Sequence, residues 1–135
     1  MTEEAKLMSG ITLITIPSIQ YGGYFLLQVL SGRFRGPGFT GFQKSMFRAG
    51  HAHAGVIVIL SLVCQLLADH TTLSLTWTWL VRAGVPVAAL LISGGFFASA
   101  LHSNAVRPNK WIGILYTGVF VLAFSLIILG AGLLI

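Results

Sequence analysis

The sequence predicts an all-α protein, an antiparallel bundle of four helices that is integral to a membrane. Of its 135 residues, 56% are hydrophobic and only 8% are charged, a composition outside the range of soluble globular proteins. The mean hydropathy is +0.89. Four apolar stretches each approach the roughly 20 residues that cross a bilayer as a helix. We therefore expect one transmembrane domain over residues 1–135, with the lipid bilayer as its main partner.

The four predicted spans are Ser9–Leu30, Phe47–Ala68, Trp79–Leu101 and Trp111–Leu134. The first follows a short segment that mixes acidic and basic residues and lacks a small-residue cleavage pattern, so we expect a retained helix rather than a signal peptide. The connection over residues 31–45 is the longest and is rich in Gly and Pro, which predicts a surface loop. Pro108 separates the last two spans.

Basic residues determine the predicted orientation, because short loops rich in Lys and Arg stay in the cytoplasm. The first and third connections and their edges hold six of them: Arg33, Arg35, Lys44, Arg48, Arg107 and Lys110. The opposite side holds only Lys6 and Arg82, diluted by acidic residues. We expect both termini outside, in a bacterial inner membrane. This bias and anionic headgroups account for the net charge of +5, so no nucleic-acid partner is expected.

The segment Gly50–Gly55 contains two imidazoles, His51 and His53, just inside the second span. Ionisable side chains in a span need partners and mark candidate functional sites. Positions i and i+2 lie about 200° apart on a helix, so two such histidines cannot ligate one ion from a regular helix. Either one faces the bundle and the other a neighbour, a subunit or the headgroups, or the helix breaks at Gly50. We favour His51, because it shares a face with Arg48 and has a glycine one turn deeper.

The predicted topology places three of the four histidines at the cytoplasmic face, since His51 and His53 open the second span and His102 closes the third. A polar stripe that repeats every fourth residue on the first span runs toward the same end. We expect a polar chamber there, with His102 pointing into the bundle. Its predicted members are Tyr24, Gln28, Arg48, His51, His53, His102, Asn104 and Tyr116.

The stretch from Met46 to Ile59 resembles the second helix of subunit I in haem-copper oxidases and their nitric-oxide-reductase relatives. There an Arg-x-x-His pattern, followed by small and apolar residues, provides an axial ligand to the low-spin haem. The resemblance implies that Arg48 matches the arginine and His51 the ligand, with His102 or another subunit's histidine as the second ligand. The leading hypothesis is haem b between His51 and His102, with Arg48 pairing a propionate and electron transfer as the activity.

A second resemblance covers more of the chain. Arg48 and Ala49 open the second span, and Ala100–His102 close the third before Gly113 and Thr117, which is similar to the membrane-associated proteins of eicosanoid and glutathione metabolism. Those are trimers that place glutathione at the cytoplasmic ends of helices from adjacent subunits. The alternative implied is a glutathione- or lipid-metabolising enzyme. The asparagine and glutamate that usually follow the arginine are replaced here by Ala and Gly.

Two further interpretations remain open. A zinc or copper ion held by His51, His53 and His102 suits imidazole chemistry, but it needs a break in the helix at Gly50. In a structural or accessory subunit, the histidines would only hydrogen-bond within the bundle, each for about 0.6 kcal/mol. Small residues predict close helix packing and a homodimer or trimer: Gly22, Gly23, Gly50, Ala54, Gly94, Gly95 and Gly118.

Overall fold

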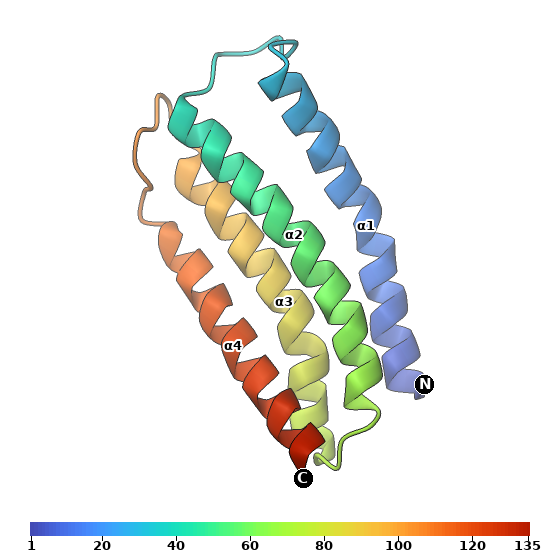
Figure 1. Cartoon of the computed structure of the whole chain (residues 1–135). Helices are drawn as coiled ribbons and strands as arrows, with labels where there is room; N and C mark the ends of the chain where they lie inside the picture. Colours follow the sequence, from blue (N-terminus) through green and yellow to red (C-terminus); the bar gives the residue numbers. More distant parts are fainter.

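The computed structural model describes all residues 1–135 and consists of four antiparallel helices (Figure 1). They are α1 (Glu3–Leu30), α2 (Gly41–Ala68), α3 (Leu75–Ala100) and α4 (Ile112–Leu134). Each is long and apolar enough to cross a membrane, and the two chain ends lie at the same end of the molecule. The predicted fold class is therefore confirmed: the chain is a small integral membrane protein whose helices contact lipid.

The helices lie side by side in chain order and do not close into a square. α3 packs along both α2 and α4, and α1 packs along α2 with only slight contact to α3. α1 and α4 do not touch (Figure 1). This arrangement leaves a groove between α1 and α3, with α2 as its floor.

The helices end where the hydropathy predicts, but three of them begin earlier. α2 starts at Gly41 rather than Phe47, because Thr40 and Gln43 form a reciprocal capping box. Thr2 occupies the N-cap position of α1, where its side chain accepts from the Ala5 N–H and Glu3 and Glu4 follow it. Ser74 occupies the N-cap position of α3 without a side-chain capping bond. The predicted spans mark only the apolar part of each helix. The first connection is correspondingly shorter than expected, covering residues 31–40.

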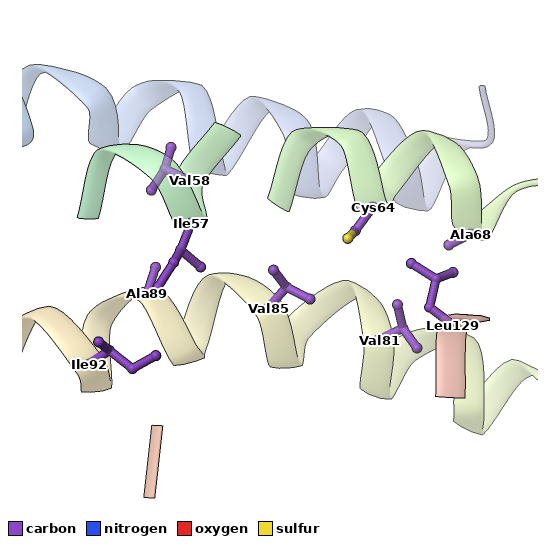
Figure 2. Close-up of a cluster of buried hydrophobic side chains, with 9 residues drawn as sticks. All are labelled: Ile57, Val58, Cys64, Ala68, Val81, Val85, Ala89, Ile92 and Leu129. Carbon is purple, nitrogen blue, oxygen red and sulfur yellow. The ribbon is translucent and has the colours of Figure 1, made fainter. Parts of the chain in front are cut away.

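The main core lies between α2 and α3, where buried side chains of the two helices face each other (Figure 2). Ile57 and Cys64 of α2 meet Val81, Val85 and Ala89 of α3 across this interface. Leu129 extends the cluster to α4. This interface fixes the position of α2 against α3, and so of any site that the two helices share.

Glycines allow close approach at several of the predicted positions. A Cβ at Gly95 would lie 2.7 Å from the Leu115 Cα, and one at Gly118 would meet Ile92 at 2.8 Å. Gly50 makes room for the ring of Phe97. Gly94, in contrast, faces open space. Close packing through glycine is therefore confirmed for Gly50, Gly95 and Gly118, and Gly22 and Gly23 of α1 lie against the His51 ring, but Gly94 makes no close contact.

Candidate functional site

His51 points from α2 toward α1 and fills the space that two glycines leave there. A Cβ added at Gly23 would lie 3.2 Å from both Cε1 and Nε2 of His51, and one at Gly22 would lie 3.5 Å from Nδ1. α2 runs as a regular helix through Gly50, so the break that would bring His51 and His53 together does not occur. As the helical geometry predicts, the two imidazoles lie on different faces.

A cavity of about 270 Å³ lies beside His51, between α1, α2 and α3. His51 has no hydrogen-bond partner elsewhere in the chain, so its ring nitrogens are free to bind a ligand. No charged side chain lines the cavity. Its walls are completed by Thr15, Ser18, Ile19, Gly22, Ala54, Val58, Ala89, Leu90, Ser93, Gly94 and Phe97.

Ser93 of α3 is the second unusual group of this cavity. It is 8% exposed, and its Oγ is buried without a hydrogen-bond partner. Serine and threonine hydroxyls in helices commonly donate to a carbonyl of the preceding turn. Thr15 and Ser18, in the same cavity, do so with the carbonyls of Thr12 and Thr15. A buried hydroxyl without a partner is costly. Ser61 and Ser125 share this state, but of the three only Ser93 lines the cavity beside His51.

The imidazole of His53, unlike that of His51, has partners within the chain. Its Nδ1 lies 2.8 Å from the Ala49 carbonyl oxygen, so Nδ1 carries the proton and donates it. The imidazole also packs at 5.0 Å from the ring of Phe96 on α3. The residue is exposed on the outside of α2. This arrangement agrees with a packing or intersubunit residue more than with a partner of His51.

His102 lies apart from His51. α3 ends at Ala100, and His102 is exposed in the following connection rather than pointing into the bundle as predicted. Gln43 Nε2 donates to the carbonyls of Ala100 and His102, which puts His102 level with Gln43. His51 follows Gln43 by eight residues, or about 12 Å along the helix. The two histidines line different cavities of one chain.

The other members of the predicted chamber do not assemble either. Tyr24, Arg48 and Tyr116 are exposed, Gln28 is half-buried, and none of these four side chains bonds another side chain. Asn104 lines the cavity of His102. The chain contains no group of three His, Cys, Asp or Glu side chains placed to hold a metal ion. The chamber expected at this end is thus replaced by two separate cavities, of which only one contains His51.

A buried polar network at the opposite end has no counterpart in the sequence-based predictions. The Arg82 side chain is 3% exposed, and its guanidinium donates to the Gln65 carbonyl at 2.9 Å and to Asp69 Oδ1 at 2.5 Å. Thr2 donates to the same carboxylate from its backbone N–H and its hydroxyl. Three helices are therefore joined at one point.

The network also satisfies backbone groups that the helices leave open. Gln65 Nε2 donates to the Arg82 carbonyl at 2.9 Å. That oxygen would normally accept from the residue four positions on, but this residue is Pro86, which has no N–H. Arg82 in turn caps a carbonyl in the last turn of α2, where a positive charge is favourable. The sequence signal was an Arg and the single Asp on either side of one short connection.

The carboxyl of Asp69 is strongly perturbed. Its burial opposes ionisation, but the hydrogen bonds from Thr2 and Arg82 and the charge of Arg82 outweigh that effect and hold the pKa of Asp69 well below its usual range. Asp69 follows the last residue of α2, outside the span. Asp69 is therefore an ionised structural anchor at neutral pH.

Comparison of the chain with protein-family models, curated proteins and solved structures finds no significant match. The candidate site is therefore defined by the geometry around His51.

Proposed function

We propose that the protein is a membrane-embedded binding protein that holds a ligand or cofactor against His51. The observation that carries this proposal is an imidazole without a protein partner, facing a cavity within a membrane span. Such a residue is costly in the bilayer unless something bonds it. His53 donates to a backbone carbonyl, so of the two imidazoles on this helix only His51 lacks a hydrogen-bond partner.

Haem b is the first cofactor to test at this site. Arg48 is exposed one turn before His51, where its guanidinium is free to pair with a propionate. Bound haem would supply electron transfer, and His51 is the residue of this cavity that would hold it. Any second histidine would come from a second copy or another subunit, because one chain offers only His51 here. Homo-oligomerisation, as a dimer or trimer, is part of this version of the proposal.

The size of the cavity limits how haem could be held. Pockets for drug-sized ligands usually measure about 300–1,000 Å³. The cavity beside His51 is about 270 Å³, and the imidazole rests on the α1 glycines. A macrocycle therefore fits only if α1 moves away from α2. For zinc or copper, His51 would supply one of the groups that coordinate the ion. The other coordinating groups would come from a small molecule bound with the ion or from a second copy of the chain.

The deciding experiment compares wild-type protein with His51→Ala and with His70→Ala, an exposed loop histidine that serves as the matched control. The proteins are produced with haem precursor and trace metals, purified in mild detergent, and analysed by visible spectroscopy, metal analysis and mass spectrometry of bound organic molecules. We expect a bound species that His51→Ala loses and His70→Ala retains. If wild type and His51→Ala carry the same content, the proposal is wrong.

A further inference from the structure

The cavity beside His51 does not end at its own walls. A second cavity of about 200 Å³ continues along the same groove between α1 and α3, and the two share Thr15, Val58, Ala89 and Leu90. The second cavity is lined mainly by apolar side chains, including Met8, Ile11 and Pro86. Together, the two cavities extend along α1 from Gly22 to Met8, which are 14 residues or about 21 Å apart. The groove thus covers about two thirds of the roughly 30 Å hydrocarbon core.

The polar groups of this groove are concentrated at one end. His51 and Ser93 line the cavity near the start of α2, where the unpartnered Ser93 Oγ is buried behind the cavity wall, whereas Thr12 and Thr15 further along donate to their own helix. Neither cavity has a charged lining residue. A neutral head with hydrogen-bond acceptors matches one end, and a hydrocarbon chain matches the rest.

The groove opens sideways rather than into water. Leu90 and Ile11 line it and are 71% and 50% exposed, and Gly94 is exposed at the level of Ser93. α1 and α3 barely touch, so their facing sides are separated by the groove along most of its length. Because these helices are membrane spans, the exposed rim contacts lipid, and a ligand can enter from the bilayer.

We infer that the groove binds a carbonyl-headed lipid, of the kind that isoprenoid quinones and fatty-acyl esters represent. The head accepts a hydrogen bond from His51 and a second one from Ser93, whose buried hydroxyl turns toward the cavity by rotation about its Cα–Cβ bond. The single tail lies along α1 and α3. This inference rests on the proposed function and names the ligand class of the same site. Since lipid is as apolar as the groove, the hydrogen bonds of the head supply the selectivity, and the tail sets the orientation.

The head is tested with Ser93→Ala. Its matched control is Ser125→Ala, because the Ser125 Oγ is also buried and unpartnered but lies on α4, outside both cavities. The probe is a decyl-tailed benzoquinone, added to protein in lipid nanodiscs, with affinity measured from the ligand-dependent thermal shift. We expect Ser93→Ala to weaken binding about three- to tenfold, as for the loss of one hydrogen bond, and Ser125→Ala to leave it unchanged. Equal affinities of these two variants contradict the inference.

The tail is tested with Val87→Trp, which places a large ring at the exposed rim of the second cavity. We expect it to weaken the decyl quinone at least fivefold and to leave the same quinone without its tail unaffected. A methyl ester with a hydrocarbon chain of the same length distinguishes a quinone from a fatty-acyl ester as the ligand. Tighter binding of the quinone indicates that the site contacts two carbonyl groups, and equal binding of the two probes indicates that it contacts one. If Val87→Trp changes neither quinone, no tail lies in the groove.

These outcomes separate the two proposals. If His51→Ala abolishes binding of a cofactor or probe while Ser93→Ala and Val87→Trp have no effect, the carbonyl-lipid inference fails and the His51 site stands. If His51→Ala has no effect on haem, metal or any quinone or ester probe, both fail.

Discussion

Arg82 is an arginine within a membrane-length helix, and it is stabilised by three kinds of partner. The Gln65 carbonyl, the Asp69 carboxylate and the Thr2 hydroxyl all accept from its guanidinium. The planar fork of an arginine suits this geometry better than the point charge of a lysine. The same contacts join α1, α2 and α3, so the residue positions α1 at the far end of the groove from His51.

Removal of one partner from this network should therefore be more damaging than removal of an exposed ion pair. Asp69→Asn leaves the buried Arg82 charge uncompensated, and we expect a loss of about 3 kcal/mol in unfolding free energy. Lys6→Gln, which breaks the exposed pair with Glu3, should have little effect. Denaturant titration in detergent measures both. The double variant Asp69→Asn/Arg82→Gln should lose less than the sum of its single changes, and strict additivity would contradict a coupled network.

The lowered pKa of Asp69 predicts an acid-dependent loss of stability. The folded state keeps this carboxyl ionised below the ordinary aspartate pKa of about 3.9, while the unfolded state binds a proton there. The stabilisation is complete above that value and is lost as pH falls through the lower pKa of the folded state. The stability difference between wild type and Asp69→Asn should thus be constant from pH 7 to about 5 and shrink below about 4. A difference that persists undiminished at pH 2 would show that the charge is not responsible.

At the scale of the helix, Gly95 and Gly94 form a natural comparison, since they are neighbours on α3 with opposite surroundings. A Cβ at Gly95 meets the backbone of α4, which cannot yield without separating the helices. We expect Gly95→Ala to destabilise by about 1–3 kcal/mol through overpacking. Gly94→Ala places its methyl in open space and gains helix propensity, so stability should be equal or higher. Thermal unfolding of the two variants measures the difference, and equal effects would show that α3 and α4 are not in such close contact.

Hydropathy predicted the existence, order and C-terminal limits of the helices, because these depend on composition over about 20 residues. It missed up to six residues at the N-terminal ends, where capping decides the boundary. Thr40 and Gln43 have the spacing of a capping box, so this signal was present in the sequence. Helical periodicity likewise separated the faces of His51 and His53 correctly. It could not identify Ser93, because a missing hydrogen bond depends on what neighbouring helices offer.

At the scale of the molecule, topology brought residues to the same end of the bundle but did not determine which helices touch. Four antiparallel spans can close into a square or lie in a row, and hydropathy is the same for both. The observed row separates α1 from α4 and opens the groove beside α1. It also explains why His51 and His102 do not meet. His102 follows the end of α3, while His51 lies two turns deeper and faces α1.

The predicted orientation has a consequence for the groove, because it puts the His51 end near the cytoplasmic surface and the Arg82 end near the outer one. Cys64 is the single cysteine and is buried, so a Cys64→Ala background carries no competing thiol. Thr72→Cys then reports the connection between α2 and α3, and Ser103→Cys the one between α3 and α4, both at exposed positions. We expect a membrane-impermeant maleimide to label only Thr72→Cys in intact cells and both variants after permeabilisation, because the basic residues Arg107 and Lys110 predict a cytoplasmic location for the Ser103 side. The reverse labelling would place the termini inside and the lipid-head end of the groove in the outer leaflet.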